Sequence, residues 1–297
     1  MKYNKSIIRT KVVKFLRKEF EKRTGYYIYP KWRALRDLDL DKEYELLGDE
    51  KLINLGGGEF FDHPRWINYD LYEPELLERI PNYRNYDFTD VDNAEIPEEN
   101  VAIVYTEHTL EHIPMDKIGK TIERVYDCLK PGGILRIIVP DAGAVIDAYD
   151  NNDWDYFKPY QSWFLNRGGE PSLEDYLLQI VATPKTNFLN EKTLGRDGPE
   201  ISPFKLTPED VKILRKEANS KEEFLDSLLK GCDKNYSTGI AHLNWFDEKK
   251  LTDILLKAGF SDVYKSGFGQ SKSLILRQVP LFDSWLPFLS LYIEAKK

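Results

Sequence analysis

The chain alternates short apolar runs with amphipathic segments from residue 51 onward. Four apolar runs predict buried strands, at 51–55, 66–69, 101–105 and 134–139. Between the last two, a buried stripe recurs at helical spacing, formed by Ile118, Ile122, Val125 and Leu129. Pro131-Gly132-Gly133 is expected to end that helix, because proline cannot extend it and glycine tolerates a left-handed turn. Strands that alternate with helices in this way indicate a parallel sheet.

Residues 145–240 interrupt this rhythm. Three helix starts are expected there, at Ser172, Thr207 and Ser220, because each is followed three positions later by an acidic residue that can complete a capping box. We therefore expect a helical insertion, or lid, after the strand at 134–139. The strand pattern then resumes with a helix at 251–258 and two last strands, at 262–265 and 290–295.

The first 48 residues form a basic extension that precedes this pattern. Apolar residues recur there at helical spacing, namely Ile8, Val12, Phe15, Leu16 and Phe20. Residues 1–36 contain twelve Lys or Arg but only two acidic residues. Two interpretations stay open: the helix packs on the domain, or residues 1–23 lie on an anionic membrane surface.

Composition narrows the classes of protein. With 297 residues, 41% of them hydrophobic, the chain can bury a full core. Its two cysteines, Cys128 and Cys232, have no metal-ligand spacing, so we expect neither a disulfide framework nor a metal site, and a cytoplasmic location. No apolar run approaches a membrane span, and Arg9 interrupts the first apolar stretch, which argues against a signal peptide. The basic residues gather at one end, so nucleic acid is not expected as the main partner.

Candidate cofactor chemistry begins at the glycine cluster 56–58. Glycines directly after a first strand let the backbone approach a ligand, and an acid at the end of the next strand, here Asp70, can hold two ribose hydroxyls. A dinucleotide fingerprint needs a third glycine where this chain has Phe61. Its ribose acid would also lie about 20 residues on, whereas Asp70 follows Gly58 by twelve. A nicotinamide enzyme is therefore not expected.

Four short motifs follow one another along the chain: I-N-L-G-G-G at 53–58, N-Y-D at 68–70, L-E-H-I at 110–113 and L-K-P-G-G-I-L-R-I at 129–137. Together they resemble the class I S-adenosylmethionine (SAM)-dependent methyltransferases, in particular the type 11 group found among polysaccharide-modification enzymes. The resemblance covers about residues 50–145 and 240–297. It implies a Rossmann-like α/β fold with a mostly parallel seven-stranded sheet, flanking helices and an antiparallel C-terminal strand pair. The methyltransferase domain would span 49–297, interrupted by the insertion.

The resemblance also implies which residues hold SAM. Gly56, Gly57 and Gly58 would lie against its methionine and ribose parts, and Asp70, with its neighbour Leu71, at the ribose. Asp92, with Asn93, would receive the adenine, although Asp90 and Asp87 compete for that role. Asn54 stands where many members carry an acid, and would bond the SAM amine without a charge pair. Thr106 and Glu107, just past the strand at 101–105, would line the methyl-transfer site.

A hydroxyl acceptor must lose a proton, which favours a nearby histidine or carboxylate. His108 is the best-placed candidate, with His242 and Asp141 as alternatives, and His112 is expected mainly to brace its loop. No Asn/Asp-Pro-Pro-aromatic sequence or cysteine follows the strand at 101–105, which argues against methylation of DNA bases. We expect transfer to oxygen or nitrogen, on a saccharide or glycoconjugate hydroxyl. A small-molecule or lipid acceptor, and a non-catalytic SAM-binding scaffold, are the alternatives.

Overall fold

A computed structural model of the chain describes residues 40–57, 63–71, 77, 82–88, 90–91, 96, 99–160, 170–182, 206–231, 242–279, 281–283 and 286–297. The basic N-terminal helix, Trp163 and Cys232 lie outside the described residues.

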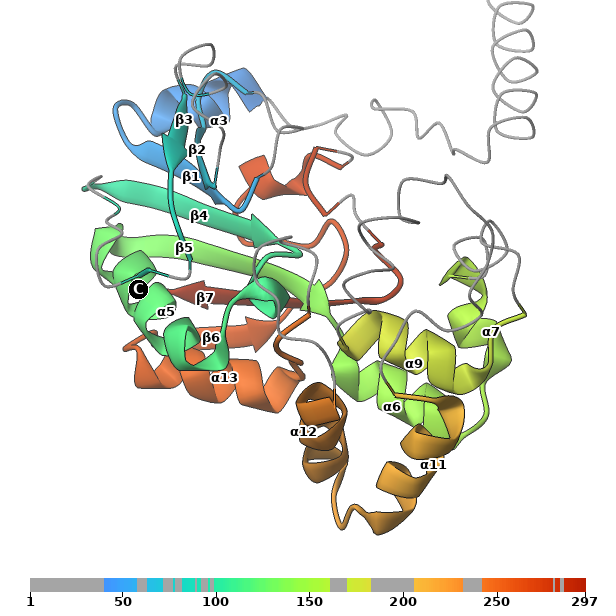
Figure 1. Ribbon diagram of the computed structural model, residues 1–297. Helices are drawn as coiled ribbons and strands as arrows, with labels where there is room; N and C mark the ends of the chain where they lie inside the picture. Colours follow the sequence, from blue (N-terminus) through green and yellow to red (C-terminus); the bar gives the residue numbers. More distant parts are fainter. Residues whose placement is uncertain are drawn as a thin grey trace, which may run out of the picture.

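A seven-stranded sheet forms the centre of the fold, in the order β3-β2-β1-β4-β5-β7-β6 (Figure 1). Its strands are β1 (Lys51–Leu55), β2 (Ile67–Asp70), β3 (Tyr83–Asn85), β4 (Val101–Glu107), β5 (Leu129–Pro140), β6 (Asp262–Lys265) and β7 (Ser290–Lys296). β7 pairs antiparallel with both β5 and β6, while the pairs formed among β1 to β5 are parallel. The predicted α/β fold class, with its antiparallel C-terminal strand pair, is confirmed.

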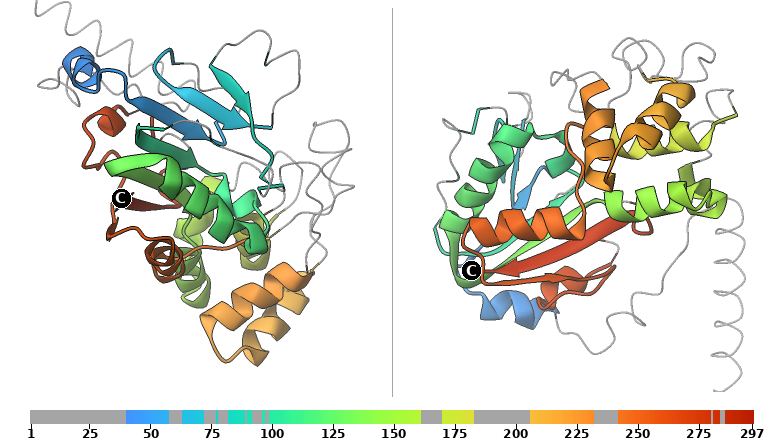
Figure 2. Two further views of the ribbon diagram at one scale, coloured as in Figure 1. Left: turned by 90° about the vertical axis from the view of Figure 1, so that its left-hand side faces the viewer. Right: turned by 90° about the horizontal axis from the view of Figure 1, so that it is seen from below.

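Helices cover both faces of the sheet. Figure 2 shows α5 (Met115–Cys128) and α13 (Glu248–Lys257) on one face, with α3 (Leu40–Leu46) and the short 3-10 helix η4 (Ile275–Arg277) on the other. Each face has its own core, because alternate residues of a strand point to opposite sides. Ile53 and Val104 join the core under α5 and α13, whereas Leu52 and Tyr105 join the core on the other face.

Three predicted boundaries need correction. β4 continues through Thr106 and Glu107, because both keep their register with β5, opposite Ile137 and Ile138. α5 ends at Cys128, and β5 already begins at Leu129, so Pro131-Gly132-Gly133 lies within β5 rather than at the helix end, with Gly132 at a φ of +78°. Lys130 precedes a proline, which disfavours the helical conformation there. β3 was not predicted, because a strand of three residues is too short to show a periodicity.

Helices follow β5 as predicted. They are α6 (Ala142–Asp150), α7 (Trp154–Phe157), the 3-10 helix η2 (Lys158–Tyr160), α9 (Leu173–Val181), α11 (Pro208–Glu217) and α12 (Lys221–Gly231). They lie beyond the carboxyl ends of β4 and β5 (Figure 1) and share a separate apolar core that includes Val145, Leu177 and Phe224. The predicted helix starts are confirmed: Ser172 and Thr207 form complete capping boxes, and the Ser220 hydroxyl accepts from the backbone of Glu223.

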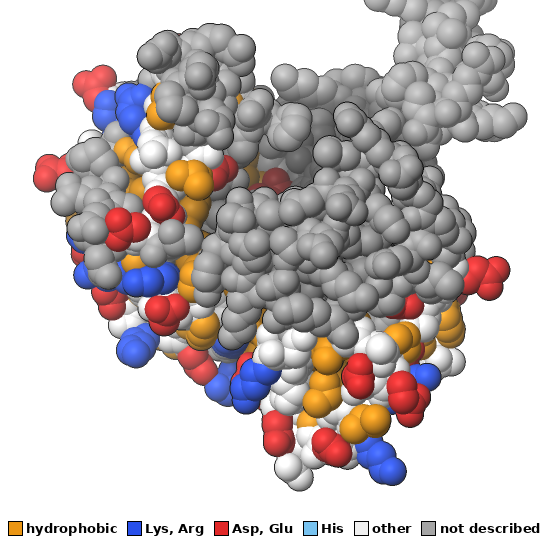
Figure 3. Space-filling model, in the orientation of Figure 1, with side chains coloured by type: hydrophobic (Ala, Val, Ile, Leu, Met, Phe, Trp, Pro, Cys, Tyr) orange, Lys and Arg blue, Asp and Glu red, His pale blue; other side chains and the backbone are white. Residues whose placement is uncertain are grey.

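The described part of the surface mixes both signs of charge. Figure 3 shows Lys and Arg interspersed with Asp and Glu on one face, with apolar side chains among them over the helices that follow β5. None of the helices in the described ranges is long and apolar enough to cross a bilayer.

Candidate functional site

The direction in which the chain adds strands reverses between β1 and β4. From β1 the chain proceeds to β2 and β3 on one side, whereas from β4 it proceeds to β5 on the other side. In open α/β sheets, ligands bind beyond the carboxyl ends of the strands at such a switch point. The predicted site residues after β1, β2, β4 and β5 therefore converge on one edge.

The turn after β1 is packed tightly on the end of β4. Gly56 has φ +77°, and a Cβ there would lie 2.1 Å from the Thr109 hydroxyl oxygen. That hydroxyl can donate to any of three carbonyls, those of Glu107 at 3.1 Å, Gly56 at 3.3 Å and Leu55 at 3.4 Å. Glycine is required at 56 for both conformation and space, and Thr109 joins the two strand ends.

Asn54 lies beneath this turn. Its Nδ2 donates to Asn68 Oδ1 at 2.9 Å, and both side chains are buried. A Cβ on Gly57 would lie 2.1 Å from Asn54 Nδ2, so glycine is needed there as well. The amide of Asn54 thus links β1 to β2, while Nδ2 of Asn68 has no partner among the described residues.

Asp70 ends β2 and is half-buried. Its Oδ1 accepts from the backbone N–H of Leu71 at 2.7 Å, and its carbonyl accepts from Tyr86 at 2.8 Å. The first bond orients the carboxylate, and the second ties the backbone at the end of β2 to the residue after β3. Leu71, beside it, is an exposed apolar side chain at 65% accessibility, as a surface that a ligand covers would be.

Thr106 and Glu107 end β4 and point to opposite faces. Thr106 is 1% exposed, and its hydroxyl has no hydrogen-bond partner among the described residues. Glu107 accepts from the Tyr105 hydroxyl at 2.9 Å. A buried polar atom without a partner is costly, so Thr106 is the stronger indication of a ligand at this strand end.

His108 follows directly and is held on both ring nitrogens. Nδ1 lies 3.0 Å from Glu111 Oε1, and Nε2 lies 2.9 Å from Ser290 Oγ. Its φ is +49°, a conformation that few residues other than glycine adopt. A carboxylate that orients an imidazole towards a hydroxyl is the arrangement in which histidine moves protons.

Glu111, from the 3-10 helix η1 (Leu110–His112), is 1% exposed. Burial alone would raise the pKa of its carboxyl, but the hydrogen bond with His108 and the nearby histidine charges lower this pKa to about 2. Glu111 is therefore ionised at neutral pH and keeps the Nδ1 proton on His108.

Asp141 follows β5 and caps α6. Its Oδ1 accepts from the backbone of Ala144 at 3.0 Å, and its Oδ2 lies 3.7 Å from Lys265 Nζ. The Tyr156 hydroxyl is buried without a partner among the described residues. Burial first, and then the charge of Asp141, raise the pKa of Tyr156. The segment after β5 thus brings an uncommitted hydroxyl towards the strand end.

His242 lies on the return from the helices to the sheet. Its Nδ1 donates to the Ile180 carbonyl at 2.7 Å, and its ring lies 4.9 Å from that of His112, at 72°. Burial, followed by the charge of His112, lowers the pKa of His242 to about 4. His242 is therefore grouped with Glu111 and His112.

Three predicted cofactor residues, Gly58, Asp92 and Asn93, lie outside the described residues. Two participants were missed by the sequence analysis. Glu111 belongs to the L-E-H-I motif, whose acid could have been paired with His108 by the spacing of three. Ser290 carries no local signal, because its contact with His108 spans 182 positions.

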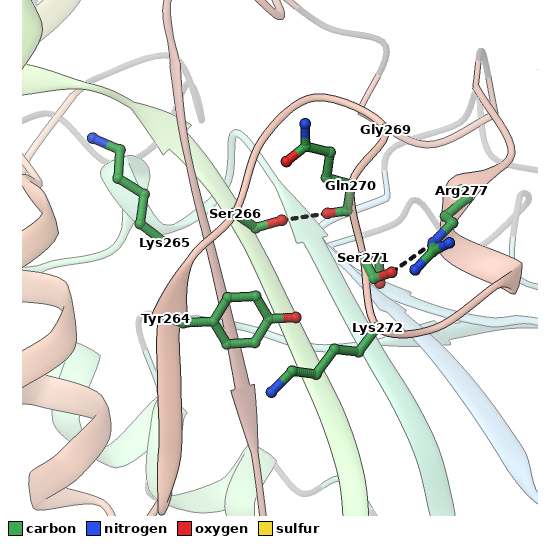
Figure 4. Close-up of a pocket in the computed structure, with 8 residues that line it drawn as sticks. All are labelled: Tyr264, Lys265, Ser266, Gly269, Gln270, Ser271, Lys272 and Arg277. Atoms are coloured by element: carbon green, nitrogen blue, oxygen red, sulfur yellow. Dashed lines mark hydrogen bonds between the residues drawn. The ribbon is translucent and has the colours of Figure 1, made fainter.

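A separate pocket of about 400 Å³ lies beside β6, lined by Tyr264, Lys265, Ser266, Gly269, Gln270, Ser271, Lys272 and Arg277 (Figure 4). Ser266 donates to the Gln270 carbonyl there, and Arg277 donates to that of Ser271. None of the predicted site residues lines this pocket, so the candidate site is the carboxyl edge at β1 and β4.

No family model and no curated protein matches the chain. Among solved structures, it is similar to a SAM-dependent methyltransferase from Mesorhizobium loti, at 14% identity over 90% of this chain and 97% of that one, with a TM-score of 0.42. It is also similar to one from Archaeoglobus fulgidus, at 14% identity over 94% and 98%, with a TM-score of 0.39. The apo form of the methyltransferase SibL shares 12% identity over 90% of this chain, which spans 57% of SibL, with a TM-score of 0.37. At such scores the similarity carries no functional argument.

Proposed function

We propose that the chain is a class I SAM-dependent methyltransferase. The observation that carries this proposal is the convergence at the β1/β4 switch point of the Gly56-Gly57 turn, the fixed carboxylate of Asp70 and the unpartnered hydroxyl of Thr106. It agrees with the first two motifs of the sequence, which contain Gly56, Gly57 and Asp70.

The residues present fit SAM. Asp70 would hold the ribose hydroxyls, the turn at Gly56 and Gly57 would lie along the methionine and ribose parts, and Leu71 would contact the adenosine. Asn54 supports the turn through Asn68 and Gly57, and its amide would also bond the SAM amine. Gly58, Asp92 and Asn93 complete the proposed cofactor set, with Glu107 beside Thr106.

SAM supplies an electrophilic methyl group on a sulfonium, so the protein must mainly align an acceptor and remove its proton. His108 is suited to the second task, because Glu111 fixes its Nδ1 proton and leaves Nε2 to accept one. The hydroxyl of Ser290 lies at that nitrogen, 2.9 Å away. An acceptor hydroxyl that took the place of Ser290 at Nε2 would hand its proton to His108, with Asp141 at the neighbouring strand end.

The acceptor we propose is a saccharide or glycoconjugate hydroxyl, as in the type 11 group. Trp154 is 46% exposed on α7, and the Tyr156 hydroxyl lies buried and unpartnered near Asp141 among the described residues. Phe157, in contrast, is fully buried and stacks on Tyr176 at 5.6 Å, so it belongs to the core of the helices. We also propose that the helical insertion at 145–240 acts as a lid. A lipid or small-molecule acceptor is the alternative to the saccharide.

Methyl-labelled SAM tests the activity directly. Saccharides, lipids and small phenols are incubated separately with the full chain, and label on a saccharide supports the proposed acceptor. SAM binding without transfer to any acceptor class would favour the non-catalytic scaffold.

Asp70→Ala tests the cofactor site. Hydrogen bonds to a charged group contribute about 1.5–3 kcal/mol each, so loss of this carboxylate should weaken SAM at least about tenfold. Isothermal titration with SAM measures this, and Asp116→Ala, an exposed acid on α5, is the matched control. Equal SAM affinity in a folded Asp70→Ala protein would refute the assignment.

A further inference from the structure

Three side chains that could bind a metal ion lie close together, and one of them contacts His108. Ligand-capable atoms of Glu111, His112 and His242 all lie within 4.8 Å of one another. Two distant segments supply them, and the backbone locks these segments together: Leu243 and Asn244 both donate to the Glu111 carbonyl, at 2.7 and 3.1 Å. The Asn244 side chain also donates to the carbonyl of Ile113. The three groups are therefore held in place by the fold.

Only one of the two oxygens of the buried Glu111 carboxylate has a hydrogen-bond partner among the described residues. Its Oε1 contacts His108, but its Oε2 has no hydrogen-bond partner among the described residues. A buried carboxylate oxygen without a partner is strongly unfavourable. A cation bound at Oε2 of Glu111 would supply the missing partner.

His242 is oriented as a metal-bound histidine is. Metal-bound histidines donate their second ring N–H to a carbonyl or carboxylate, and His242 donates Nδ1–H to Ile180 at 2.7 Å. His112 Nε2 lies 3.9 Å from Glu111 Oε1.

We propose that Glu111, His112 and His242 bind a divalent transition metal ion of the zinc class. Two imidazoles and one carboxylate form a known ligand set for such ions, and metal–ligand distances of about 2.0–2.2 Å require the three side chains to close slightly. The sequence analysis expected no metal, because the ligands come from two segments far apart in the chain. The site adjoins the proposed base, because Glu111 also holds His108, but none of its three ligands is a proposed SAM contact.

Zinc binding to tag-free, chelator-treated full-length protein tests the proposal. Isothermal titration should show about one Zn²⁺ per chain, and Zn²⁺ should raise the melting temperature, since a ligand of the native state stabilises it. Co²⁺ should add visible absorption bands that report imidazole coordination. Changes outside the direct ligands already cost about 10–100-fold in metal affinity, so His112→Gln and His242→Gln should each weaken Zn²⁺ by about 100-fold or more.

His63→Gln is the matched control. His63 stacks on Tyr44 and does not belong to the group of three potential ligands. Circular dichroism checks that each variant is folded. Should His242→Gln be unfolded, the half-buried His112→Gln carries the test. Absence of Zn²⁺ binding by the wild-type chain, unchanged affinity in a folded His112→Gln protein, or equal loss in His63→Gln would each overturn the proposal. SAM affinity is measured in parallel, so that failure of the cofactor site is recognised separately.

Discussion

Two buried tyrosines, Tyr86 and Tyr105, differ in whether the hydroxyl is hydrogen-bonded. Tyr86 is 1% exposed, and its hydroxyl has no hydrogen-bond partner among the described residues. Tyr105 is equally buried, but its hydroxyl donates to Glu107 and accepts from the backbone of Asp283 at 2.7 Å. A buried polar group is unfavourable unless it is hydrogen-bonded, so the same substitution should have opposite signs at the two positions.

Tyr86→Phe is expected to raise the free energy of unfolding by about 1 kcal/mol, because it removes an unsatisfied hydroxyl. Tyr105→Phe, the matched control, should lower the free energy of unfolding by about 1–3 kcal/mol. Glu107 and the backbone N–H of Asp283 would each lose a hydrogen-bond partner. Urea denaturation measures both values. A clear loss of stability in Tyr86→Phe would mean that its hydroxyl is bonded in solution.

The same residue predicts a dependence on alkaline pH. Burial raises the pKa of Tyr86 from 10.0 to about 12, against the opposing charge of Arg124. The folded state thus keeps a proton that the unfolded state releases, so the contribution to stability is present below pH 10.0 and is lost as the pH rises towards 12. Tyr86→Phe should therefore lose less stability over this range than the wild type.

At the scale of elements, α9 depends on its first turn. Ser172 and Asp175 form a reciprocal capping box, and nearly the whole helix is buried in the core of the helices that follow β5. Its last turn presents the Ile180 carbonyl that fixes His242. The cap therefore supports both the helix and the position of a proposed metal ligand.

Ser172→Ala should lower the free energy of unfolding by about 1 kcal/mol, within the range of 0.5–2 kcal/mol that helix caps contribute. Ser172→Thr keeps the hydroxyl and should stay within about 0.5 kcal/mol of the wild type. Urea denaturation followed by circular dichroism compares them. Equal stability of the alanine and threonine variants would show that the cap does not hold this helix.

At the scale of the whole molecule, Arg136 joins parts of the chain that the sequence separates widely. Its fully buried guanidinium donates to Asp283 at 2.9 Å, to Glu294 at 3.3 Å and to the carbonyls of Gly267 and Gln270. It therefore ties β5, β7 and the loop beside the pocket of Figure 4 together. Removal of one partner from such a network leaves buried charges without compensation.

Arg136→Met should lower the free energy of unfolding by about 3–5 kcal/mol, the usual cost of breaking a buried ion pair on one side. The triple variant with Asp283→Asn and Glu294→Gln removes the stranded charges and should recover at least about half of that loss. Chemical denaturation gives both values. A single variant that loses less than about 1 kcal/mol would show that the network contributes little.

The sequence by itself determined the elements and their order. Strand runs at 51–55 and 262–265, the helix starts at Ser172 and Thr207, and the helices after β5 were all predicted, because periodicity and capping act between neighbours a few residues apart. Boundaries were less certain where pairing with a neighbouring strand, as for Thr106 and Glu107, extended an element beyond its local pattern.

Only the tertiary structure decided which side chains share a site. Ser290 reaches His108 across 182 positions, and Asn54 donates to Asn68 across the β1–β2 pair. His242, considered from the sequence as an acceptor-side base, lies instead with Glu111 and His112. Such contacts depend on strand order and on helix packing, which bring together residues whose own neighbourhoods carry no sign of the partner.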